Sequence, residues 1–587
     1  MAPNSGSVSP DDGLGRWAHK LGHQLAEESP ETQAIPFTDL LDTLSETTQL
    51  LLQYPYCLPL YLFLARIYGN LGYPDLAAGA AYKALLLSDA VRDESDEYHE
   101  QATEAVEEVL ARSPLPHLCR HSSSRQDKDC SDVVAAVETF YLSLIYHVLA
   151  TSLLQCGCFR SAHQYCSLAV KMFPDDLHVQ KMMSDIRHNV AQVSEESSLS
   201  SIDLNATATW PDQGLVRREQ YQWNDFEPDR FGNLDELNAM MTEVAPKLEV
   251  VAVDLPLLSA ALSSTVAERT TKQLGIFAKE DIQPGEIVLK EKSLLTANNK
   301  LQDALCDACS TDLPLIGSPD FDKTVACGDC EIVFCSQDCH DAAMEVYHPA
   351  LCEKDLDAVA RDVLPAQAAD SLYSLLLQRA LAMAETQQCH PLALKEVKYI
   401  WGDFCNVLME KTQYTNLSKR SAFRNMPRTL PFSFEYNIRL PFHMLEKMDI
   451  DIFRNPQYDV WVFNSLYAKF RGTASARLSG LGGRTIRGPE VSAVHSMWCM
   501  ANHSCDPNVS WEWGGEINFW ARENRVAWQR DGEKIWRSEP GIRKGEEVFN
   551  HYCDVELGVK DRREWASGSL GGDCRCARCV WEAKEDS

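Results

Sequence analysis

Cysteine and histidine side chains stand in pairs along the middle of the chain, at spacings that metal ions require. Two C-x2-C pairs, one C-x3-C pair and one H-x3-C pair are formed, in order, by Cys306 and Cys309, Cys327 and Cys330, Cys335 and Cys339, and His348 and Cys352. Thiolate and imidazole groups at these spacings place both members of a pair on one tetrahedral zinc ion. The eight ligands predict two closed zinc sites with a structural role, because closed sites leave no coordination position for catalysis.

A second group of residues with chemical potential lies toward the C-terminus. Residues 502–508 read Asn-His-Ser-Cys-Asp-Pro-Asn, and Pro507 excludes a continuing helix, so this stretch is predicted to be an ordered loop. On local grounds alone such a loop reads as a turn rich in Asn, Asp and Pro without a function. Downstream follow the run Gly545-Glu546-Glu547-Val548, which leads to Tyr552, and a C-x-C-x2-C tail formed by Cys574, Cys576 and Cys579.

These motifs, in this order, resemble the SET domain of protein lysine methyltransferases, whose signature is an NHSC-x-PN loop, a GEE-x4-Y strand and a cysteine-rich post-SET tail. The paired cysteines resemble the MYND zinc finger, which places the chain with methyltransferases that carry both domains. Its interleaved topology implies one zinc ion held by Cys306, Cys309, Cys335 and Cys339, and another held by Cys327, Cys330, His348 and Cys352. The resemblance implies a third zinc ion, which folds the tail over the cofactor, held by Cys505, Cys574, Cys576 and Cys579.

The same resemblance implies S-adenosylmethionine as methyl donor and a protein lysine as acceptor. The family's cofactor contacts map to Asn502 and His503, and the tyrosine that orients methyl group and amine maps to Tyr552. Only Gly275 of the family's G-x-G turn is present, and Trp581 either covers the adenine or is a surface aromatic without a role. A lysine with a pKa of about 10.4 is protonated at neutral pH, so a desolvating channel beside a sulfonium must supply the neutral amine.

The N-terminal part of the chain is predicted to be helical. Residues 1–35 are polar and predicted to be disordered, whereas residues 36–193 contain two stretches with the spacing of tetratricopeptide repeats, Tyr61 to Ala84 and Tyr146 to Pro174. Such a stack either offers a concave surface to a partner protein or only packs against the catalytic half, and the sequence leaves both open. The Ser- and Thr-rich residues 194–220 are predicted to be a linker.

The remaining chain is predicted to be one interrupted SET domain at residues 248–582. Its parts are a strand at Glu249–Leu255, a β-hairpin formed by Leu274–Ala278 and Ile282–Val288, the MYND finger at 306–352, a helical insert at 353–477, the SET core at 491–556 and the post-SET tail at 573–582. The fold class is therefore α+β: an N-terminal α-helical repeat region, then a SET-type β fold interrupted by a MYND zinc finger and a helical insert, with a post-SET zinc site.

Composition restricts the partners. A chain of 587 residues with 55 Lys and Arg against 85 Asp and Glu carries a formal charge of -30, which disfavours direct nucleic-acid binding and suits lysine-rich protein tails. No run of 18 or more apolar residues and no N-terminal apolar segment occurs, so we expect no membrane partner and a location in the nucleus or the cytoplasm. A catalytically inactive scaffold for protein-protein interactions is the alternative function. The motifs encode neither the target lysine nor the degree of methylation.

Overall fold

The structure is a computed structural model that describes residues 37–112, 133–196, 203, 205–217, 220–256, 258, 270–299, 305–354, 356, 368–402, 428–477, 490–530, 533–570 and 572–585. Contacts divide the chain into two compact units, Met1–Arg217 with Val407–Arg439 and Asp451–Trp461, and Arg218–Asn406 with Leu440–Ile450 and Val462–Ser587.

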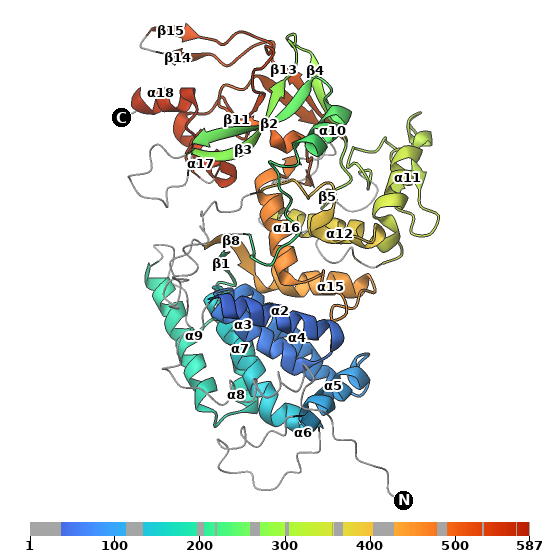
Figure 1. Cartoon of the computed structure of the whole chain (residues 1–587), viewed down its shortest axis with the longest axis vertical. Coiled ribbons are helices and arrows are strands. Elements are labelled where there is room, and N and C mark those ends of the chain that lie inside the picture. The colour runs from blue at the N-terminus through green and yellow to red at the C-terminus, as the bar shows by residue number, and fades with distance from the viewer. Residues whose placement is uncertain are drawn as a thin grey trace, which may run out of the picture. The chain divides into compact units, whose positions relative to one another are not determined.

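The first unit contains a stack of helices, coloured blue to teal in Figure 1. Its helices are α2 (Phe37–Gln53), α3 (Leu58–Asn70), α4 (Pro74–Arg92), α5 (His99–Arg112), α6 (Val133–Ala136), the π-helix η2 (Val137–Tyr141), α7 (Leu142–Gln155), α8 (Phe159–Met172) and α9 (Leu177–Glu196). Helix α3 packs against α4, α4 against α7, and α7 against α8. The two predicted repeats thus fall on helix pairs, and helices α5 and α9 cover the two further segments that the sequence suggested.

Glycine and alanine residues explain why the paired helices turn and approach closely. Gly72 ends the α3–α4 turn with φ +80° and Gly157 ends the α7–α8 turn with φ +82°, both in the left-handed region that glycine favours. Ala77, Ala81 and Ala84 on α4 are buried, so their short side chains let the neighbouring helices come near. The stretch Val133–Gln155 is apolar and long enough to cross a membrane by length and composition, yet half of it is buried among the other helices, as a core helix would be.

The predicted linker contains ordered structure. Strand β1 (Gln213–Arg217) lies within residues 194–220 and pairs in antiparallel fashion with β8 (Arg428–Ser433), which lies within the predicted helical insert. Val216, Leu430 and Phe432 are buried on this ribbon, and that burial explains why a segment with linker-like composition folds as a strand. Residues 353–477 therefore contribute to both units instead of forming one insert.

The second unit combines short sheets with helices. Helix α10 (Leu234–Val244) packs against β2 (Leu248–Pro256), which pairs with β3 (Thr270–Ala278). Strand β4 (Ile287–Glu291) pairs with β13 (Ile517–Ala521), and β13 with β12 (Val509–Trp513). The other strands are β5 (Thr296–Asn298), β6 (Val325–Ala326), β7 (Val333–Phe334), β9 (Ser475–Arg477), β10 (Val491–Ala493), β11 (Asn502–His503), β14 (Trp528–Arg530), β15 (Glu533–Trp536) and β16 (Phe549–Asn550). The other helices are α11 (Gln337–Val346), α12 (Ala368–Thr386), α15 (Leu440–Lys447), α16 (Val460–Thr473, its first two residues in the first unit), α17 (Val559–Leu570) and α18 (Ala577–Glu585).

One expected pairing is wrong. Residues 274–278 and 282–288 do not form a hairpin with each other, because β3 pairs with the preceding β2 and β4 joins β13 in a different sheet. Ile282 instead bridges to Ile542, 260 positions along the chain. The helices expected at 372–381 and 458–471 are confirmed as α12 and α16. Residues 1–35, the loops at 121–132 and 480–488, and the helical positions Phe404, Val407 and Leu408 lie outside the described residues.

Candidate cofactor site and zinc sites

Two identical backbone turns present the first four cysteines of the zinc module. The amide of Cys306 donates to the carbonyl of Thr311 at 2.8 Å, and the amide of Cys327 donates to that of Ile332 at 2.9 Å. The residue after each C-x2-C pair, Ser310 or Glu331, has a positive φ, of 58° and 62°. Each of the two segments therefore folds back tightly enough to point two sulfur atoms in one direction.

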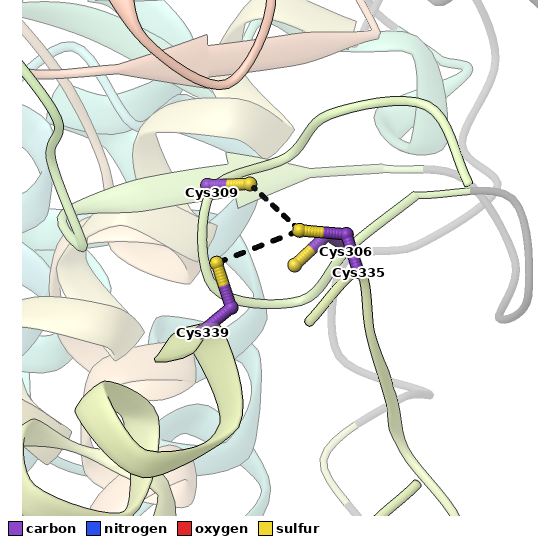
Figure 2. A group of neighbouring side chains, drawn as sticks. All are labelled: Cys306, Cys309, Cys335 and Cys339. Carbon is purple, nitrogen blue, oxygen red and sulfur yellow. Dashed lines mark hydrogen bonds between the residues drawn. The ribbon is translucent and has the colours of Figure 1, made fainter. Parts of the chain in front are cut away.

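The module brings its eight predicted ligands together as two sets, in the interleaved order that the resemblance implied. The potential ligand atoms of Cys306, Cys309, Cys335 and Cys339 lie within 4.8 Å of one another, and so do those of Cys327, Cys330, His348 and Cys352. Figure 2 shows the first four sulfur atoms pointing toward a common centre. The Cys309–Cys335 and Cys327–Cys352 sulfur distances are both 3.8 Å.

These distances match the tetrahedron that zinc prefers. With Zn–S bonds near 2.3 Å, tetrahedral geometry separates two sulfur atoms by roughly 3.8 Å. In the second set the Nε2 atom of His348 lies 3.5 Å from the sulfur of Cys330, so this nitrogen completes the set. His340 follows Cys339 directly in the sequence, but its ring contacts Gln337 and Asp341 on the surface of α11. Both sets could therefore hold a zinc ion.

A buried charged network attaches the zinc module to helix α12. Asp307 lies between the first two cysteines and accepts a hydrogen bond from the Tyr347 hydroxyl at 2.7 Å. Arg379 on α12 donates to the carboxylate of Asp307 at 3.1 Å and to its main-chain carbonyl at 2.9 Å, and its guanidinium lies 3.6 Å from the centre of the Tyr347 ring. The three side chains are nearly inaccessible to solvent, and the buried ion pair joins the zinc module to helix α12.

The third predicted set is also assembled. Cys505 lies in the 502–508 loop, and its sulfur is 3.3 Å from that of Cys579 and 4.0 Å from that of Cys574 in the C-terminal tail. Cys576 completes the group, whose four sulfur atoms lie within 4.8 Å of one another. The set could hold a third zinc ion, and it joins two segments that are about 70 residues apart.

Arginine side chains surround these four sulfur atoms. Arg562 on α17 is fully buried and its guanidinium lies 3.6 Å from the sulfur of Cys579. Arg578 donates to the main-chain carbonyl of Cys505 at 3.0 Å, and Arg563 donates to that of Cys574 at 3.2 Å. Four thiolates around one divalent ion carry a net charge of about -2, so these cations offset the charge left on the cluster.

The 502–508 loop lies directly beside the segment that leads to Tyr552. Strands β11 and β16 pair in parallel, with Asn502 opposite Phe549 and His503 opposite Asn550. The side chain of Asn508 strengthens this pairing, because its Nδ2 donates to the Glu547 carbonyl and its Oδ1 accepts from the Phe549 amide, both at 2.7 Å. Asn508 therefore stabilises the loop through these two bonds.

Asn502, Glu547 and Gly275 meet at one point. The Asn502 Nδ2 atom donates to the carboxylate of Glu547 at 2.7 Å and to the main-chain carbonyl of Leu274 at 3.0 Å. A Cβ atom added to Gly275 would lie 2.7 Å from the Glu547 Oε1 atom and 3.0 Å from the Asn502 Nδ2 atom. Only glycine therefore lets β3 pass so close to these groups. Burial raises the pKa of Glu547, and the hydrogen bond from Asn502 opposes that rise.

Tyr552 and His503 are held by reciprocal contacts. The Tyr552 hydroxyl donates to the main-chain carbonyl of Ala501 at 2.8 Å, and burial raises the pKa of Tyr552, so the phenol stays neutral. The Tyr552 amide donates to the His503 Nδ1 atom at 3.0 Å. Burial lowers the pKa of His503 to about 4, so the neutral ring carries its proton on Nε2 and donates it to the Cys505 sulfur, 3.3 Å away.

Comparisons with known proteins identify this arrangement. The model of the SET domain family matches residues 273–553. This chain carries a SET domain. It is also similar to "SET domain and MYND-type zinc finger protein 6" of Schizosaccharomyces pombe, with 20% identity over 331 residues, which cover 56% of this chain and 53% of that protein. The chain thus spans about half the length of this curated relative.

The SET domain contains one further cysteine that the sequence reading missed. Cys553 follows Tyr552 directly, and its sulfur lies within 4.8 Å of the Cys505 sulfur and the His503 ring nitrogen. These three side chains form a weaker candidate metal set, because the Nε2 atom of His503 carries the proton that it donates. Cys553 has no neighbouring cysteine at metal spacing in the sequence, so no local signal could have revealed it. Only the parallel pairing of β11 with β16 brings it to the cluster.

Glu291 is a second residue of the SET domain that no motif indicated. It lies on β4 and its buried carboxylate accepts hydrogen bonds from the Met497 amide at 3.1 Å and the Trp498 amide at 2.8 Å. Ser496 Oγ donates to the same carboxylate at 3.4 Å. Burial raises the pKa of Glu291 to about 7, although the hydrogen bonds oppose the rise. This carboxylate fixes the turn that leads into Ala501 and Asn502.

Trp581, predicted to cover the adenine, lies half-buried on α18. Helix α18 packs against β14, and the indole Nε1 atom of Trp581 is buried with no hydrogen-bond partner among the described residues. Among the described residues this indole makes no hydrogen bond to Asn502 or His503, and the role of Trp581 stays a prediction.

Proposed function

We propose that this chain is an S-adenosylmethionine-dependent protein-lysine N-methyltransferase. The observation that carries the proposal is the hydrogen bond from the Tyr552 hydroxyl to the Ala501 carbonyl, at the junction of the 502–508 loop and β16. A hydroxyl oxygen and a neighbouring carbonyl oxygen are two acceptors at one spot. They suit an amine that must be held in one orientation while it attacks.

The residues around Asn502 fit the proposed cofactor. Gly275 keeps open a space that a Cβ atom would fill, next to Asn502 and Glu547. The Asn502 side-chain oxygen and the second carboxylate oxygen of Glu547 accept no hydrogen bond within the part of the chain that the structure describes. These acceptors suit a ligand that carries an ammonium and a sulfonium group. When bound, S-adenosylmethionine would supply an electrophilic methyl group.

The chain's own residues would orient and desolvate the acceptor. The neutral Tyr552 phenol, already donating to Ala501, has lone pairs left to accept an N–H of the lysine amine. The surrounding buried groups disfavour an ammonium, which lowers the pKa of an entering lysine toward the neutral form. The His503 ring holds the Tyr552 amide at 3.0 Å and thereby fixes where the hydroxyl points. No dedicated base is required.

The three cysteine sets would each hold zinc in a structural role. Their ligands are closed sets of four, and the sulfur distances fit zinc, as described above. We further propose that the substrate is a histone or another protein with an accessible lysine, and that the protein acts in the nucleus or the cytoplasm. Protein partners would contact the helical repeats or the MYND finger, and we propose neither a membrane nor a nucleic-acid partner.

The test separates cofactor binding from methyl transfer. Calorimetric titration with S-adenosylmethionine should give binding in the wild type, little binding in Asn502→Ala and near wild-type binding in Tyr552→Phe. Transfer of a radiolabelled methyl group to an array of lysine-containing peptides should fall by about 100-fold or more in Tyr552→Phe. Tyr399→Phe is the matched control, since it also removes a tyrosine hydroxyl that donates a hydrogen bond in the same unit, in this case to the carboxylate of Glu236.

The inactive-scaffold alternative makes the opposite prediction. Wild-type protein with all its zinc would then give no heat with S-adenosylmethionine, and an orthogonal binding assay would agree. Equal transfer by the wild type and Tyr552→Phe would refute the role given to the hydroxyl while leaving cofactor binding intact.

A further inference from the structure

A hollow of 510 Å³ lies in the helical unit, far along the chain from the SET motifs. One wall is helix α5, which contributes Gln101, Glu104, Ala105 and Glu108. These positions are spaced i, i+3, i+4 and i+7, so they form one continuous face of that helix. Gln101 and Glu104 on this face are exposed, and Ala105 and Glu108 are half-buried.

The helix that forms this wall and the turn before it are acidic, although Arg112 lies in the last turn of the helix. Residues 93–108 contain eight Asp and Glu side chains and no Lys or Arg. Most of these carboxylates are exposed. Glu104 has no ion-pair partner among the described residues, whereas Glu108 pairs with Arg112 at 2.6 Å. Glu104 therefore presents uncompensated negative charge to whatever enters the hollow, whereas the charge of Glu108 is partly offset by Arg112.

The opposite side of the hollow is apolar and aromatic. It is formed by the end of α2 and the following turn, where Leu52 is 53% exposed and Tyr54 is half-buried. Tyr56 is fixed by a hydrogen bond from its hydroxyl to Asp451 at 2.6 Å. Arg454 also lines the hollow, but its charge is compensated by Asp451 at 3.8 Å and its guanidinium lies 5.4 Å from the Tyr56 ring centre.

We propose that this groove binds an extended segment of a partner protein that carries lysine or arginine beside apolar residues. Glu104 would pair with a cationic group of the partner, and Glu108 would share its carboxylate between Arg112 and a second cationic group. The aliphatic stems of the partner's cationic side chains would lie on Leu52 and the Tyr54 ring. Glutamine at position 101 offers a donor and an acceptor to the peptide backbone. The inference does not depend on methyl transfer, although a basic, lysine-bearing protein would suit both sites.

The test measures binding of a fluorescein-labelled (Lys-Ala-Leu)4 peptide to the full-length protein by anisotropy, with (Glu-Ala-Leu)4 as the charge-reversed peptide. We expect the basic peptide to bind and the acidic one to fail. Replacing both wall carboxylates, Glu104→Gln with Glu108→Gln, should weaken binding about tenfold. Leu52→Ser should weaken it as well, without any change in charge.

A second double variant, Glu100→Gln with Glu107→Gln, controls for general electrostatics. It makes the same change in net charge on the same helix, but neither residue lines the hollow. We expect this variant to bind within about twofold of the wild type, because it removes only long-range attraction. Equal weakening in the two double variants, equal binding of the two peptides, or no binding of the basic peptide would each overturn the proposal. Unchanged circular dichroism verifies that the variants are folded.

Discussion

The buried carboxylate of Glu291 should make the stability of the SET domain depend on pH near neutrality. Burial raises the pKa of Glu291 in the native state to about 7, from the ordinary glutamate value of 4.5. Since the native pKa exceeds the unfolded one, the native state holds a proton between these two values that the unfolded state has lost. The contribution to stability is then complete below pH 4.5 and is lost as pH rises through 7.

The magnitude follows from the two pKa values. One pKa unit corresponds to about 1.4 kcal/mol, so a difference of about two and a half units is worth about 3 kcal/mol in total. Glu291→Gln cannot titrate. The free energy of unfolding of the wild type minus that of Glu291→Gln should therefore shrink by about 2 to 3 kcal/mol between pH 5 and pH 8.

Urea unfolding at four pH values, followed by tryptophan fluorescence, measures this difference. Trp498, whose main-chain amide donates a hydrogen bond to this carboxylate, provides a nearby reporter. Glu512→Gln is the matched control, because Glu512 is an exposed carboxylate on β12 of the same sheet. The reasoning is refuted if the difference in the free energy of unfolding between the wild type and Glu291→Gln stays constant within about 0.5 kcal/mol from pH 5 to pH 8.

Three further substitutions test the sites. Cys553→Ala should keep about three zinc ions per chain by elemental analysis, whereas Cys505→Ala should lose one; equal loss would make Cys553 a metal ligand. Gly275→Ala should weaken S-adenosylmethionine binding about tenfold in calorimetry, because its Cβ has no room, and Gly514→Ala, which has nothing within 4 Å, should leave binding unchanged. Arg379→Leu should destabilise the protein by about 3 to 5 kcal/mol in urea unfolding, because it leaves a buried carboxylate without its cation; a loss below about 1 kcal/mol contradicts this.

The zinc ligands were predictable because zinc imposes short spacings on the sequence itself. A C-x2-C pair is a local signal, and the structure groups the eight ligands of the module in the two sets that the resemblance to the MYND finger implied. Helices such as α12 and α16 were predictable for the same reason, because an apolar period of 3.6 residues is also a local signal.

Strand pairing was not predictable in the same way. Residues 274–278 and 282–288 are close in sequence and alternate like a hairpin, yet β3 pairs with β2 and β4 with β13. Alternation of apolar and polar residues indicates which face of a strand is buried, but it does not indicate which strand lies beside it. The strand β1 was missed for a related reason, because Gln213–Arg217 is polar in part and gains its stability only from burial against β8.

The residues missed at the site share one property, which is that long-range contacts define their role. Glu291 lies 206 positions before Met497, whose amide donates a hydrogen bond to its carboxylate. Nothing around Glu291 in the sequence marks a buried carboxylate. Cys553 looked like an isolated thiol. Its neighbours Cys505 and His503 approach it only after the chain has brought β11 and β16 together.

One short path connects the third cysteine set to the proposed catalytic hydroxyl. The sulfur of Cys505 accepts the Nε2 proton of His503, the Nδ1 atom of His503 accepts the Tyr552 amide, and the Tyr552 hydroxyl donates to Ala501. The imidazole must be neutral, with its proton on Nε2, to make both contacts. The protonation state of the Cys505 sulfur therefore constrains the position of Tyr552. Zinc at this set would keep Cys505 a thiolate and hence a good acceptor. The MYND sets have no such path to Tyr552 among the described contacts, so metal at the tail set matters most for the geometry of transfer.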